Sequence, residues 1–179
     1  MATPPDFSPG QVLTAAHMDA VGLWLVKTHT VGSAESSVTV SNCFSADYDA
    51  YLVIYSGGLL SADTAICLRI GNANAGYYGA YVYGQYNSTA LASAPDNNNS
   101  RFTFVGGGDN VSGAGLVATV NNPFVTKQTY VTSSNVSYAT NAGSYSGRLA
   151  NANSYTSVTL FPVSGTMTGG TIRVYGYRN

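Results

Sequence analysis

Charged residues are scarce in this chain. Only 8% of its 179 residues are Asp, Glu, Lys or Arg, against about 25% in an average soluble protein. Glutamate occurs once, at Glu35, and lysine twice, at Lys27 and Lys127. Because long helices normally contain many Glu, Lys, Leu and Ala residues, this composition argues against a helical protein. The net charge of −1 provides no basic stripe for phosphates, so we expect no nucleic-acid partner.

Cysteine and histidine are also rare. Cys43 and Cys67 are too few for a disulfide scaffold, and we expect two separate small buried residues, with a single disulfide as the alternative. The only histidines, His17 and His29, show neither HxH nor HExxH spacing. We therefore predict ordinary surface or hydrogen-bonded histidines, with no metal site and no cofactor.

The carboxylates and glycines form no pattern that is typical of an active site. Asp47 and Asp49 precede an apolar strand and are expected to cap a turn. A calcium site at Asp47/Asp49 or at Asp109/Asn110 is the alternative, although neither has EF-hand spacing. No GxSxG motif occurs, and Gly106–Gly108 lacks the Lys-Ser/Thr of a phosphate loop. We predict no catalytic residue and no enzyme activity.

Long apolar runs are absent, so no stretch reaches the roughly 20 residues that span a bilayer, and no membrane insertion is expected. The N-terminal sequence MATPPD lacks the basic start and apolar core of a signal peptide. We expect synthesis in the cytosol and exit by another route, such as cell lysis.

The residues that are abundant favour β-structure. Val, Thr and Tyr favour strands, whereas Gly, Asn and Ser favour turns. Loops are predicted at the Asn-rich stretch 87–100 and at the glycines of 57–58, 106–108 and 169–170. Nine to eleven strands result, which predicts an all-β protein, a jelly-roll-like antiparallel β-sandwich, with a barrel as the alternative. The predicted strands are 23–31, 36–41, 50–55, 64–70, 79–86, 101–105, 115–121, 126–132, 144–149, 155–161 and 171–177.

The N-terminal 22 residues read differently from the rest. Prolines and a glycine predict an extended arm over 1–12, and an uninterrupted run after Thr14 predicts one short helix over 14–22. We assign 1–22 to assembly and 23–179 to a single β-sandwich domain. The apolar residues expected to anchor the arm and helix on a neighbouring surface are Phe7, Val12, Leu13, Met18, Val21 and Trp24.

Tyrosine is the one unusually frequent residue type with a distinctive side-chain chemistry. The chain has 14 tyrosines, and five of them fall within ten residues: Tyr77, Tyr78, Tyr81, Tyr83 and Tyr86. Flat aromatic faces that carry hydroxyls suit sugar rings and protein interfaces. We predict a recognition surface here, with simple packing of each ring on the sheet as the alternative.

Three stretches resemble one family. They are FSPGQVLTAAHMDAV (7–21), NCFSADYDAYLVIYSG (42–57) and TLFPVSGTMTGGTIRVYGYR (159–178). They are similar to small structural proteins of tailed bacteriophages, often described as minor tail or tail-fibre-associated proteins. The resemblance implies a virion component with no catalytic residues to carry over, and leaves recognition to the stretch 72–112. By analogy with fibres and capsid caps, it also implies a homotrimer.

Three functions follow as hypotheses. A tail-associated module would contact other tail proteins and host cell-surface glycan. A capsid decoration or cement protein would cover the major capsid protein in many copies, which suits the small size and the lack of a fibrous stalk. A glycan-degrading enzyme is the least favoured, since it needs two carboxylates facing each other in one groove.

Overall fold

The computed structural model describes residues 9–10, 12, 22–136 and 141–177, and for residues 135 and 136 it describes the backbone alone. The predicted arm (1–12) and helix (14–22) therefore lie almost entirely outside the described residues. Within them the chain is all-β, with antiparallel strands and no helix. The strands are β1 (Leu23–Thr30), β2 (Val38–Val40), β3 (Ala50–Leu60), β4 (Thr64–Ile70), β5 (Tyr77–Gln85), β6 (Leu91–Asn99), β7 (Phe102–Gly108), β8 (Ala114–Asn121), β9 (Thr129–Val136), β10 (Asn141–Leu149), β11 (Val158–Pro162) and β12 (Met167–Tyr177).

The strands form one hydrogen-bonded sheet of 12 strands that branches at β8. One side of β8 pairs with β3, which continues through β12 to β1. On its other side, the first residues of β8 pair with β7 and the last with β9. The β7 branch runs on through β4 and β11 to β2, and the β9 branch runs through β10 and β5 to β6. The chain is therefore antiparallel as predicted, but this connectivity does not show a jelly roll.

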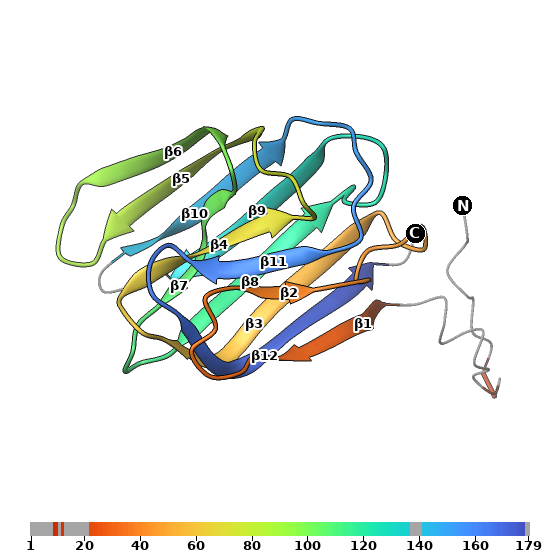
Figure 1. The fold of residues 1–179 in the computed structure, drawn as a ribbon, viewed down its shortest axis with the longest axis horizontal. Helices are drawn as coiled ribbons and strands as arrows, with labels where there is room; N and C mark the ends of the chain where they lie inside the picture. Colours follow the sequence, from red (N-terminus) through yellow and green to blue (C-terminus); the bar gives the residue numbers. More distant parts are fainter. Residues whose placement is uncertain (1–8, 11, 13–21, 137–140, 178–179) are drawn as a thin grey trace.

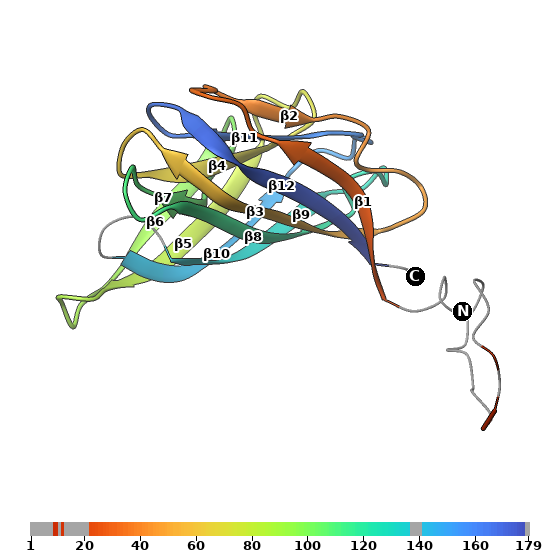
Figure 2. The same ribbon diagram turned by 90° about the horizontal axis from the view of Figure 1, so that it is seen from below.

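The branching places two layers against each other. Strands β2, β11 and β4 lie over β12, β3, β8 and β9, as Figures 1 and 2 show from two directions. Strict alternation makes this possible, because every second side chain of a strand points to the same face. In β3, Tyr51, Val53 and Tyr55 are buried between the layers, whereas Leu52 and Ile54 point outward and are partly exposed. The buried apolar residues form one cluster contributed by both layers.

Several predicted loops are strands. The stretch 87–100 contains β6, and Gly106–Gly108 belong to β7. Strand β3 continues past Gly57 and Gly58 with a bulge, and β12 already begins at Met167, so it includes Gly169 and Gly170. These glycines lie where neighbouring backbones approach closely. A Cβ on Gly170 would lie 2.6 Å from the backbone nitrogen of Gly58, so glycine is required there for steric reasons.

Candidate functional site

Strand β5 divides the predicted tyrosine cluster between its two faces. Tyr77 and Tyr81 point between the layers and are fully buried. The Tyr77 hydroxyl accepts a hydrogen bond from the Ile70 nitrogen at 2.9 Å and lies 3.2 Å from the Ala73 carbonyl oxygen, to which it donates. These two rings are core residues that do not face solvent, so they are not available to the recognition surface predicted for this cluster.

The other three tyrosines of the cluster are at least partly accessible. Tyr83 is half-buried and stacks on Tyr81, with 4.9 Å between ring centroids. Tyr78 lies on the outer face of β5, and Tyr86 is 65% exposed in the turn that follows this strand. Because Tyr78, Tyr83 and Tyr86 lie on different parts of the hairpin, they do not form one continuous platform.

The predicted anchoring residues are mostly outside the described part of the chain. Phe7, Leu13, Met18 and Val21 belong to the undescribed residues. Val12 is 80% exposed. Trp24 is partly buried on β1, opposite Gly176 of β12. Its indole nitrogen is buried and has no hydrogen-bond partner among the described residues.

Asp47 and Asp109 make local hydrogen bonds within turns. Ser45 Oγ donates to a carboxylate oxygen of Asp47 at 2.9 Å. Asp109 accepts hydrogen bonds from the backbone nitrogens of Ser112 and Val111, and these bonds lower the pKa of its carboxyl. Within the described ranges, no group of three or more His, Cys, Asp and Glu side chains could hold a metal ion. The same part of the chain contains no helix long and apolar enough to cross a membrane.

Cys43 and Cys67 are free, separate and buried, as predicted. The Cys43 thiol donates to the Val40 carbonyl oxygen at 3.2 Å, and the Cys67 thiol to that of Thr103 at 3.5 Å. Burial raises the pKa of each thiol to about 12. Both therefore remain neutral thiols near pH 7 and are poor nucleophiles.

A buried polar network lies where the sequence predicted a loop. Asp96 of β6 is 5% exposed, and its carboxylate accepts hydrogen bonds from the Thr103 nitrogen, Thr103 Oγ1, Asn99 Nδ2 and the Tyr145 hydroxyl. These four donors offset the cost of burying the carboxylate. Gly79 leaves room for the arrangement, because a Cβ there would lie 2.2 Å from the Tyr145 hydroxyl. The network is structural, since its groups are already engaged with one another.

The outward face of the row β1-β12-β3-β8-β9-β10-β5-β6, here called the outer face, carries the remaining candidates. Its rows follow from the strand register, in which Thr119 pairs with Thr132 and Thr132 with Ser146. Ser134 pairs with Ser144 in the next row. The outward positions of these strands include two arginines, Arg148 and Arg173, and no carboxylate. The face is therefore wide and sparsely charged.

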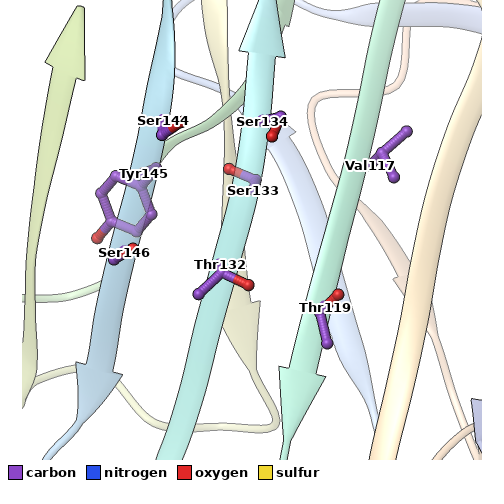
Figure 3. A pocket seen from close by; sticks show the side chains of 8 residues that line it. All are labelled: Val117, Thr119, Thr132, Ser133, Ser134, Ser144, Tyr145 and Ser146. Atoms are coloured by element: carbon purple, nitrogen blue, oxygen red, sulfur yellow. The ribbon is translucent and has the colours of Figure 1, made fainter.

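Hydroxyl groups line a shallow hollow in the middle of the outer face. The hollow has a volume of about 350 Å³. Figure 3 shows Thr132 and Ser134 on β9, flanked by Ser144 and Ser146 on β10 and by Val117 and Thr119 on β8. None of these five hydroxyls has a hydrogen-bond partner in the described part of the chain. We call this the hydroxyl hollow.

One edge of the hydroxyl hollow is aromatic. Tyr130, which is 46% exposed, pairs with Arg148, and Arg148 pairs with Tyr78. The Arg148 guanidinium lies 5.5 Å from the centre of the Tyr78 ring and donates to Gln128 Oε1 at 3.2 Å. A tyrosine ring and a held guanidinium plane therefore stand next to the free hydroxyls.

The other end of the outer face is apolar. Leu25 of β1 pairs with Tyr175 of β12, which pairs with Leu52 of β3. In the neighbouring row, Leu23 pairs with Tyr177. Leu23, Leu25 and Tyr177 count among the exposed large apolar side chains. We call these five residues the apolar end.

No family model matches the chain, and no curated protein matches its sequence.

Proposed function

We propose that this chain is an exterior structural protein of a bacteriophage particle, which acts by assembly and binding as a homo-oligomer. Its proposed location is the tail, as a minor tail or fibre-associated protein. The observation that carries the proposal is the outer face: it is broad, sparsely charged, apolar at one end and hydroxyl-lined in the middle. Such a surface suits contact with other molecules, and the described residues offer no convergent catalytic groups beside it.

The position of the phage-like stretches supports the proposal. The stretch 42–57 includes most of β3, and the stretch 159–178 includes β12. These two strands pair along most of their length, so the phage-like residues form the centre of the wide sheet. The hydroxyl hollow lies outside these stretches, on β8, β9 and β10. A scaffold that resembles phage proteins, combined with a binding surface outside the phage-like stretches, is consistent with a virion protein.

The homo-oligomer would form through the apolar end, with a second copy of the same chain as the occupant. Strand β1 pairs with β12 alone among the described strands, so one of its edges is unpaired next to the exposed Leu23 and Leu25. Interfaces between identical subunits are richer in apolar surface than the rest of a protein. The assembly segment 1–22 leads directly into β1 and would extend the same contact. The trimer remains an expectation from the resemblance.

The test is the copy number and position of the protein in an intact particle, measured by quantitative mass spectrometry and by antibody labelling in electron micrographs. A few copies at the tail are expected. Tens to hundreds of copies on the head shell would overturn the tail location and favour the second candidate, a capsid decoration or cement protein. Absence from purified particles would refute both.

The cement alternative is favoured by one observation, the breadth of the outer face, which spans eight strands and has no stalk attached within the described residues.

Deletion of residues 1–22 tests whether this segment is needed for assembly, in either location on the particle. We expect the sheet to fold and incorporation to be lost. Normal incorporation of the truncated chain would contradict the anchoring role.

A further inference from the structure

We propose that the hydroxyl hollow is a binding site for a neutral saccharide, with Tyr130 as the stacking platform. The inference deepens the proposed function, since host-surface contact by a virion protein would use such a site. It replaces the predicted tyrosine cluster of β5 with residues of β8, β9 and β10.

The floor of the hollow has the chemistry of a sugar site. A hydroxyl is both donor and acceptor, as are the hydroxyls of a sugar, so the two can pair in either direction. Thr119, Thr132 and Ser146 follow one another across three adjacent strands. Two strand spacings of about 4.8 Å make this row roughly 10 Å long. The volume of about 350 Å³ lies at the small end of the range for ligand sites.

The hydroxyls are available to a ligand. None of them bonds to another described residue, so a sugar would displace water without breaking internal hydrogen bonds. Four of the five belong to exposed residues, Thr132, Ser134, Ser144 and Ser146, so a ligand can reach them directly from solvent. Val117, which is 51% exposed, adds an apolar side chain to the lining.

The edge of the hollow supplies an apolar contact for a sugar ring. The C–H face of a pyranose packs on an aromatic ring, and Tyr130 is exposed for this contact. Arg148 lies next to it, held by Tyr78 and by Gln128. A guanidinium that is already held loses little conformational entropy when it donates to a sugar oxygen.

The lining of the hollow favours a neutral ligand, because none of its eight residues is charged. The outward arginines of the same face, Arg148 and Arg173, lie beyond this lining, and the Arg148 guanidinium already contacts Tyr78 and Gln128. No outward carboxylate is present to hold a bridging metal ion. Hydrogen bonding and stacking are therefore the forces that remain for recognition.

The test is NMR titration of the full-length protein with neutral di- and trisaccharides of glucose, galactose and N-acetylglucosamine, with uronic-acid and sialylated sugars alongside. We expect at least one neutral sugar to shift the resonances of β9 and β10, with a Kd of millimolar order for one small site. Tyr130→Ala is expected to weaken binding about tenfold or more, and Tyr130→Phe to retain it, because stacking needs the ring alone. Thr132→Val is expected to weaken binding several-fold, through loss of one hydroxyl at constant shape.

Matched controls lie away from the hollow and from the apolar end. Tyr86 is 65% exposed in the turn after β5, and Thr28 is an outward threonine of β1. Tyr86→Ala and Thr28→Val are expected to leave the Kd unchanged. Circular dichroism of each variant identifies any that fails to fold, in which case Tyr130→Phe and Thr132→Val still decide the outcome.

Three results would overturn the proposal: no shift with any neutral sugar, binding of acidic sugars alone, or equal losses in the hollow variants and the controls. The location experiment stays separate. A virion protein that binds none of these sugars would retain the proposed function and lose this site, whereas a sugar-binding protein absent from particles would show the reverse.

Discussion

The hydroxyl of Tyr145 is expected to make a measurable contribution to stability. It lies 2.7 Å from Asp96 Oδ2 in the buried network, and burial, reinforced by the Asp96 carboxylate, raises the pKa of this tyrosine far above its usual value. The ring packs edge-on against Phe102, with 6.0 Å between centroids. Replacing Tyr145 with Phe therefore removes one hydrogen bond while keeping the ring in place.

The expected loss is about 2 kcal/mol. A hydrogen bond to a charged group contributes about 1.5–3 kcal/mol net to stability. The cost of leaving the buried Asp96 carboxylate with one donor fewer falls within that range. The carboxylate keeps its bonds from Asn99 and from both donors of Thr103, so the network is weakened but not abolished. Asp96→Asn should cost more, because its amide would direct N–H groups toward donors that need an acceptor.

Urea unfolding followed by far-ultraviolet circular dichroism measures the effect. With a slope of about 2 kcal/mol per molar urea, the Tyr145→Phe midpoint should fall by about 1 M at constant slope. Tyr130→Phe is the matched control, since its exposed hydroxyl has no described hydrogen-bond partner, and its midpoint should not move. Equal midpoints for Tyr145→Phe and the wild type would refute the energetic role of the network.

Three further predictions concern packing, pH and assembly. Gly106→Ala should lower stability by about 2 kcal/mol, because its Cβ would lie 2.7 Å from the Gly115 carbonyl oxygen. Gly115→Ala should be tolerated, because its Cβ would be in ordinary van der Waals contact, 3.8 Å from the Tyr55 carbonyl oxygen, and calorimetric Tm values compare the two variants. Folding raises the pKa values of the Cys43 and Cys67 thiols from 9.0 to about 12. The neutral thiols therefore contribute fully to the free energy of unfolding below pH 9, and this contribution is lost as the pH rises toward 12. Between pH 9 and pH 12, each thiol should lower the free energy of unfolding by about 1.4 kcal/mol per pH unit. A double Cys→Ala variant whose free energy of unfolding falls equally steeply with pH would contradict this. Leu25→Asp should convert the homo-oligomer to monomers in light scattering after size exclusion, and an unchanged mass would exclude the apolar end as the interface.

Alternation and composition were sufficient to predict the all-β class and most of the strands. The clearest successes are 50–55 and 64–70, where apolar residues mark core strands that lie within β3 and β4. Strand β6 was missed because its sequence, rich in Asn and containing Pro95, is typical of a loop. It forms as a strand because it pairs with β5 and because Asp96, an inward residue, is satisfied by partners distant in the sequence.

The loop positions predicted for several glycines were wrong for a related reason. Gly106 and Gly170 read as loop residues, but both lie in strands at points where a Cβ would meet a neighbouring backbone. A single sequence gives no sign of this difference, since a glycine needed for a turn and a glycine needed for close approach look identical. The distinction depends on which strands become neighbours, and that is set by the branching at β8.

The site was harder to predict than the fold because both faces of the large sheet carry aromatic residues. Alternation along β5 puts Tyr81 and Tyr83 on one face, but the sequence could not show that the second layer covers this face and buries Tyr81. The opposite face drew no attention in the sequence, because serine and threonine at alternate positions are usual for solvent-facing strand residues. Their importance comes from register, which aligns Thr119, Thr132 and Ser146 and sets Tyr130 beside them. A recognition surface made of such ordinary residues is a property of strand pairing, so the decisive experiments are those that change one hydroxyl or one ring while leaving the pairing intact.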